Sequence, residues 1–185
     1  MSTPEIPAGT WTIDTSHSEV GFTVRHLMVS KVRGNFSNFE GTITIGEDPL
    51  ASSVTAEVDL SSINTRDEGR DEHLRSADFF EVEKYPKMTF ASTSVAPKGS
   101  RFDVTGDLTI KGITRPVVLS LEFNGVSTDP WGGTRAGFSA ETEINRKDFG
   151  VDFNIPLDGG GVVVGDAVKV VLEVEAVFQP ALVNA

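Results

Sequence analysis

The chain has 185 residues, a formal net charge of −11 at pH 7 and no cysteine. Its twenty-seven Asp and Glu outnumber sixteen scattered Lys and Arg, which disfavours binding to nucleic acid or to an anionic membrane surface. The lack of cysteine excludes disulfides and thiolate metal or redox sites, and a chain of this length with 38% hydrophobic residues is predicted to bury the core of one domain.

The amino-terminal region is predicted to be a flexible lead-in. Residues 1–9 carry two prolines and precede a single expected domain over 10–180, which a short tail over 181–185 follows. The lead-in has no basic segment followed by an apolar run, and no window of the chain reaches the ~18 consecutive apolar residues of a membrane helix. We therefore expect no integral membrane segment and a cytoplasmic location.

Apolar residues at every second position predict strands in the first third of the chain. After a first strand that begins at Trp11, a second strand places four side chains on one face, namely Val20, Phe22, Val24 and His26. The segment 31–46 is predicted to be one long strand, interrupted near Gly34 and Gly41, where glycine permits a bulge or a bend. Another inward row follows over 54–60.

The stretch NTRDEGRDEHLRSADFF, residues 64–80, breaks this alternation and concentrates charge. Read as a helix, it places Arg66, Arg70 and His73 along one stripe, which is a candidate anion-binding face. Asp71 on the neighbouring stripe is expected to orient Arg70 or His73. The alternative is a solvated helix whose charges only pair with one another or pin it to the neighbouring strands.

Alternating strands resume after the helix, from Met88 and over 102–110, 114–123, 136–144 and 168–178. Eight or nine such strands with many glycines predict a sandwich or a closed antiparallel barrel, and closure removes exposed edges. Several inward positions are small, which indicates an interior with unfilled space: Gly106, Ala136, Ala140 and Ala176. Barrels of about eight strands can hold one ligand.

The chain contains no Gly-Xaa-Ser-Xaa-Gly elbow and no phosphate-binding loop. His17, His26 and His73 could in principle form a three-histidine zinc site, but their spacing matches no local ligand motif. We therefore expect polar contacts from these imidazoles and no metal.

Two further features have competing interpretations. Trp11 and Trp131 are expected to plug a barrel end or anchor a loop, and stacking on a ligand is the lesser alternative. The run NRKDFG offers a cation in Arg146, although a solvated turn with Gly150 in a left-handed conformation explains it almost as well.

Four segments carry a resemblance across residues 10–179: HSEVGFTVRHLMVSKVRGNF from His17, INTRDEGRDEHLRSADFFEVEKYPKMTF from Ile63, LTIKGITRPV from Leu108 and INRKDFGV from Ile144. They resemble the YceI-like family, the polyisoprenoid-binding proteins with a lipocalin-like barrel. The resemblance implies a mainly β fold, an extended eight-stranded antiparallel barrel with one main α-helix packed beside it. It also implies an isoprenoid quinone, polyprenyl phosphate or fatty-acid-like ligand; some members form dimers, and many are periplasmic.

We therefore expect non-enzymatic binding, storage or transport of a long-chain isoprenoid lipid, with no catalytic residue, no cofactor, no nucleic acid and a homodimer left open. The expected contacts to the lipid head group are His17, His26, Arg66, Arg70, His73 and Arg146. The expected contacts to the lipid tail are Val20, Phe22, Val24, Phe90, Leu108, Leu119, Leu121, Phe138 and Val170. The alternatives are a metal- or histidine-dependent enzyme on a small hydrophobic substrate, or a stress-related structural protein with a filled barrel.

Overall fold

The structure is a computed structural model that describes residues 5–155, 157 and 163–180. Its strands are β1 (Gly9–Ile13), β2 (Glu19–His26), β3 (Ser30–Phe36), β4 (Phe39–Ile45), β5 (Ser53–Asp59), β6 (Ile63–Asn64), β7 (Lys87–Lys98), β8 (Arg101–Ile110), β9 (Ile113–Thr128), β10 (Thr134–Asn145) and β11 (Val164–Gln179). Its helices are α1 (Glu68–Arg75) and the 3-10 turns η1 (Thr15–His17), η2 (Pro49–Ala51), η3 (Leu60–Ser62) and η4 (Arg146–Phe149). The expected tail and the first four residues of the expected lead-in lie outside the described residues.

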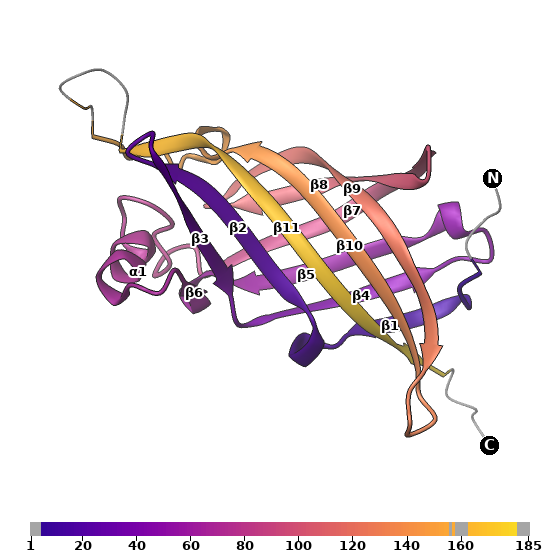
Figure 1. Cartoon of the computed structure of the whole chain (residues 1–185). Helices are drawn as coiled ribbons and strands as arrows, with labels where there is room; N and C mark the ends of the chain where they lie inside the picture. Colours follow the sequence, from indigo (N-terminus) through magenta and orange to yellow (C-terminus); the bar gives the residue numbers. More distant parts are fainter. Residues whose placement is uncertain (1–4, 156, 158–162, 181–185) are drawn as a thin grey trace.

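The strands form one antiparallel sheet that closes on itself (Figure 1). Strand β1 pairs with β4 on one side and with β11 on the other, where Trp11 lies opposite Ile43 and Phe178. The ring runs β1-β4-β5-β7-β8-β9-β10-β11 and back to β1. This closure confirms the predicted eight-stranded antiparallel barrel with one α-helix.

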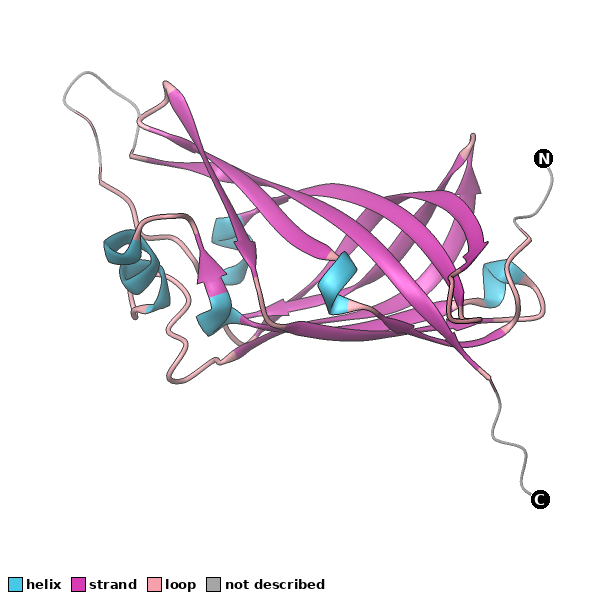
Figure 2. Ribbon diagram, turned by 60° about the horizontal axis from the view of Figure 1, so that its bottom comes forward, coloured by secondary structure: helices cyan, strands magenta, loops and turns pink. Residues whose placement is uncertain are grey.

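Strands β2 and β3 extend the sheet beyond the ring. Turn η1 separates β1 from β2, and both strands pair with β11. Beyond β2, the sheet continues through β3 to the short β6 at the end of the barrel where α1 lies (Figures 1 and 2). At that end β2, rather than β1, is therefore the neighbour of β11, and β3 continues the sheet from it.

The predicted single strand over 31–46 is wrong, because Ser37 and Asn38 separate β3 from β4. The Asn38 amide donates to the Ser62 hydroxyl, so the break keeps its hydrogen bonds. Gly34 and Gly41 lie inside the two strands instead of at a bulge. At Gly34 an added Cβ would overlap the ring of Phe22, so glycine is required there by close packing.

Three apolar clusters make up the core of the described residues; two of them pack against Leu74 of α1, and the third surrounds Trp11. Trp11 is fully buried among Ile45, Ala136, Phe138 and Ala176, which fits the expected end plug. Ala136 and Ala176 therefore make room for the indole and leave no empty space. Trp131 is 85% exposed, so the expectation that it plugs an end or anchors a loop is wrong.

The helix is much shorter than the predicted stretch. Asp67 caps its first turn by accepting a hydrogen bond from the Arg70 amide, and Ser76 ends it. Arg66 precedes the cap with a φ of 64°, so it does not continue the stripe of Arg70 and His73. Among the described residues, no helix has the length and apolar character needed to cross a membrane.

Candidate functional site

A cavity of about 750 Å³ runs through the barrel. Because alternate residues of each strand point inward, its wall consists mainly of apolar side chains from eight or more strands. All nine residues expected to contact a lipid tail line it: Val20, Phe22, Val24, Phe90, Leu108, Leu119, Leu121, Phe138 and Val170. The volume lies within the range of roughly 300–1,000 Å³ that ligand pockets commonly have.

Charged and imidazole groups enter the wall mainly from the α1 end. Arg70 and His73 come from α1, His26 from the end of β2, and Arg146 from η4. These are four of the six residues expected at a lipid head group. Arg66 and His17 are the other two, and neither lines the cavity.

Hydrogen bonds through Thr65 and the buried Asp71 hold Arg70 in place. The side chain of Asp71 is 6% exposed and accepts hydrogen bonds from the Thr65 amide and hydroxyl at 2.9 and 2.5 Å. The Arg70 Nε donates to that same hydroxyl at 2.8 Å, and its Nη2 donates to the Thr65 carbonyl at 2.7 Å. Asp71 therefore orients Arg70 through Thr65, which leaves the Arg70 Nη1 without a partner among the described residues.

His73 lies at the boundary between the cavity and solvent. Its Nε2 is 2.9 Å from the Asp78 carboxylate, and its side chain is 46% exposed. The ring packs edge-on against Phe79 and Phe153, with centroid separations of 5.0 and 5.2 Å. A ligand group at this boundary can meet an imidazole without crossing the apolar wall.

Arg146 is buried and its donors are already used. The guanidinium donates to the carbonyls of Gly165, Val151, Phe153 and Val164 at 2.9, 2.7, 3.0 and 3.2 Å. Burial lowers the pKa of this guanidinium, and the nearby carboxylate of Asp166 raises it. The geometry makes Arg146 a clamp that joins residues 151–153, just after η4, to the start of β11.

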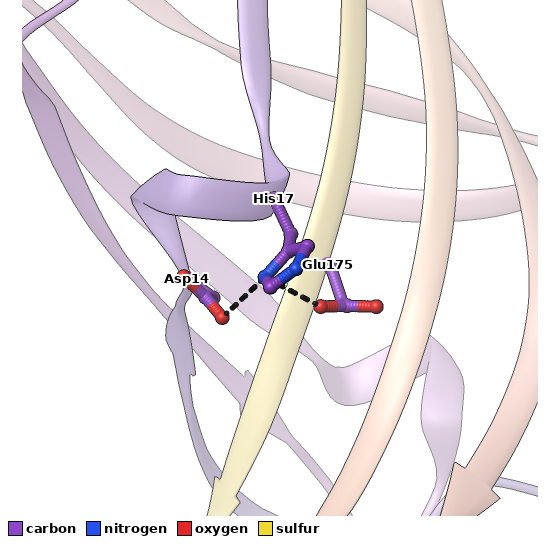
Figure 3. Close-up of side chains that lie close together, drawn as sticks. All are labelled: Asp14, His17 and Glu175. Atoms are coloured by element: carbon purple, nitrogen blue, oxygen red, sulfur yellow. Dashed lines mark hydrogen bonds and ion pairs between the residues drawn. The ribbon is translucent and has the colours of Figure 1, made fainter. Parts of the chain in front are cut away.

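His17 lies on the outer surface of the barrel, in a cluster with Asp14 and Glu175 (Figure 3). The three ligand atoms lie within 4.8 Å of one another, which is a spacing that a metal ion could use. Arg135, however, already contacts the Asp14 and Glu175 carboxylates at 2.7 and 2.8 Å. The cluster is therefore balanced by a cation of the protein, and His17 does not meet His26 and His73 in a three-histidine site.

Arg66 is exposed and forms no side-chain hydrogen bond or ion pair with the described residues. Sequence reasoning missed Thr65, which connects Asp71 to Arg70, and Phe153, which packs on His73. The signal for Thr65 was its place two residues before the cap residue Asp67, where a hydroxyl commonly bonds to nearby groups. Phe153 lies in a segment without periodicity, so no pattern marks it.

The matched family model decides the relationship. The YceI-like domain matches residues 11–176, which include α1, η4 and all of the ring except the first two residues of β1 and the last three of β11. The chain belongs to the YceI-like family.

Curated relatives and solved structures resemble the chain. The chain is 44% identical over 164 residues to Protein YceI of Escherichia coli O157:H7, covering 88% of this chain and 83% of that one. A crystal structure of a Campylobacter jejuni YCEI protein is 30% identical with a TM-score of 0.70, and the match covers 97% of this chain and 100% of that one. A polyisoprenoid binding domain from Saccharophagus degradans shares the fold at a TM-score of 0.70 and 16% identity, covering 92% of this chain and 98% of that one.

Proposed function

We propose that this YceI-like protein binds one long isoprenoid lipid inside the barrel and acts as a non-enzymatic carrier or store. The observation that carries the proposal is the apolar cavity of about 750 Å³ with its charged groups gathered mainly at the α1 end. An amphiphile with one polar head and a long tail has the same distribution of polarity. The similarity in fold to a domain described as polyisoprenoid-binding supports the same ligand class.

Burial of the tail supplies the affinity. At about 0.8 kcal/mol per buried CH₂, one five-carbon isoprene unit contributes on the order of 3 kcal/mol before ordering costs. Several units therefore suffice for tight binding. The wall discriminates weakly between apolar chains, since one methylene changes binding by only about 1–3 kcal/mol in such a pocket.

Recognition of the head is assigned to Arg70, with His73 and His26 beside the same cavity. The Thr65 contacts fix two nitrogens of the Arg70 guanidinium and leave Nη1 available, so little ordering remains when a phosphate oxygen binds. An imidazole that lines the cavity can donate a hydrogen bond to a quinone carbonyl. Arg146 is left out of the head-group contacts because four carbonyls already hold it.

Native mass spectrometry and lipid extraction of the purified protein test the proposal. We expect recovery of a bound isoprenoid, or uptake of a polyprenyl phosphate after delipidation, and failure of both contradicts the proposal. Arg70→Ala is expected to weaken binding of the phosphate far more than binding of the corresponding alcohol. Arg66→Ala, which changes an exposed arginine outside the cavity, is the matched control. Equal losses for phosphate and alcohol in Arg70→Ala would refute the head-group assignment.

A further inference from the structure

The β2–β3 hairpin differs in charge from the rest of the chain. From Glu19 to Phe36 the hairpin holds three of the sixteen Lys and Arg, and its only acidic residue is Glu19, at the end of β2 away from the tip. Arg25, Lys31 and Arg33 are all exposed, and none of them forms an ion pair with another described residue. A protein with a net charge of −11 thus presents one cationic hairpin.

These cations are aligned on the outer face of the sheet. Arg25 lies directly opposite Lys31 in the strand pairing, and Thr23 lies between Arg33 on one side and Lys169 on the other. Like charges on directly opposed residues destabilise a sheet. An anionic ligand on this face would remove that repulsion.

A shallow outer depression of about 350 Å³ adjoins the same cations. Arg25, Lys31 and Lys169 line it beside Met28, together with the carboxylates of Glu143 and Asp166. Asp166 is engaged by Lys147 at 3.4 Å and lies 3.7 Å from Arg146. The depression therefore combines surplus positive charge with an apolar side chain.

The tip of the hairpin is apolar and conformationally costly. Leu27, Met28 and Val29 are 40%, 47% and 85% exposed. The Val29 amide donates to the His26 carbonyl, and the two central residues, Leu27 and Met28, have φ angles of 52° and 63°. Turns that need positive φ at both central residues usually contain Asn-Gly. Here the two central positions instead carry the large apolar side chains of Leu27 and Met28, which are exposed to water.

The tip is continuous with the cavity wall. Val24, His26 and Val32 of the same hairpin line the cavity from the inner face. The Leu27 amide donates to the Val163 carbonyl, and the Val163 amide donates to the carbonyl of Ile155, which is 53% exposed. Apolar surface thus extends from the lumen to the outside at this point.

We infer that the β2–β3 hairpin is a membrane-contact element, with its apolar tip inserted among lipid chains and its cations against anionic phospholipid head groups. Cations that flank a small apolar projection are the combination that holds peripheral proteins at such a surface. The net charge of −11 disfavours contact of the rest of the protein with an anionic membrane, as the composition predicts, so the inference is confined to the hairpin. The exposed Glu68 and Glu72 belong to α1, which lies apart from the hairpin tip in Figures 1 and 2. The inference goes beyond the proposed function, because it concerns an outer surface and needs no isoprenoid.

Sedimentation with vesicles tests the inference, using phosphatidylcholine alone and phosphatidylcholine mixed with phosphatidylglycerol in equal parts. The native protein is expected to bind the mixed vesicles, and added salt is expected to weaken binding. A charge variant carries Arg25→Gln, Lys31→Gln and Arg33→Gln. Because each cation near an anionic surface contributes roughly fivefold, this variant should bind on the order of a hundredfold more weakly.

A second variant, Leu27→Asn with Met28→Gly, separates binding from folding. It installs the dipeptide that this turn prefers, so the melting temperature is expected to rise while vesicle binding is lost. Trp131→Ser is the control, since it removes an exposed apolar side chain from a different hairpin, between β9 and β10, and should leave binding unchanged.

Three results would overturn the inference. The first is a native protein that does not sediment with mixed vesicles, and the second is an Asn-Gly variant that binds as well as the native protein. The third is a native dimer that the Asn-Gly variant dissociates while no vesicle binding occurs, which would assign the tip to a second copy of the chain. The vesicles contain no isoprenoid, so each of these results leaves the proposed lumen function standing.

Discussion

Replacing Arg146 with methionine should destabilise the fold without altering head-group selectivity. The substitution keeps an apolar stem in the buried site but removes the donors that hold the carbonyls of Val151, Phe153, Val164 and Gly165. A buried acceptor left without a partner costs about 1–3 kcal/mol, and water can reach the partly buried ones. We therefore expect a loss of about 4 kcal/mol in the free energy of unfolding.

Urea denaturation followed by tryptophan fluorescence measures this loss, because Trp11 lies in the core of the barrel. With a denaturant slope of about 2 kcal/mol per molar urea, the midpoint should fall by about 2 M. Arg66→Met makes the same substitution at an exposed site and should change the free energy of unfolding by less than about 0.5 kcal/mol. If Arg146→Met barely moved the midpoint and selectively weakened polyprenyl phosphate binding, Arg146 would be a head-group contact and the clamp would be refuted.

Three further perturbations follow from the geometry. Gly34→Ala should cost about 1–3 kcal/mol and reduce lipid uptake, because the new methyl displaces the Phe22 ring; unchanged thermal stability would contradict this packing. Thr65→Val removes the hydroxyl between Asp71 and Arg70. In a lipid titration, binding of a polyprenyl phosphate should therefore weaken, while binding of the corresponding alcohol persists. Hydrogen bonds from a neighbouring serine and from Arg135 lower the pKa of Asp14, so its contribution to stability is complete above about pH 4 and is lost as the pH falls. Melting curves of Arg135→Gln should accordingly lose less stability on acidification than those of the native protein, and parallel profiles would count against the pairing.

The barrel and its lining were predictable because alternation in a strand is a local property. The prediction that small inward residues leave the cavity was nevertheless wrong at three of four positions, since only Ala140 lines it. The space beside Gly106 is occupied by the ring of Phe90, and Ala136 and Ala176 pack in the Trp11 cluster. The width of an eight-stranded ring, rather than small inward residues, makes the lumen.

The candidate head-group site was only partly predictable. Helical spacing grouped Arg70 with His73, and both line the cavity. The same spacing included Arg66, but a left-handed backbone before the helix cap removes it. No local pattern could show that the carbonyls of two separate segments converge on Arg146, or that η1 places His17 outside the barrel.

Closure between β1 and β11 has a kinetic consequence. The pairing of Trp11 with Phe178 joins segments from nearly opposite ends of the chain, so the longest loop must close before the ring exists. A chain emerging from the ribosome without residues 164–179 leaves β1, β2 and β10 without their β11 partner and an apolar wall exposed to water, which together favour association with other chains. The strand that is synthesised last is thus the one that converts an aggregation-prone surface into an enclosed lumen.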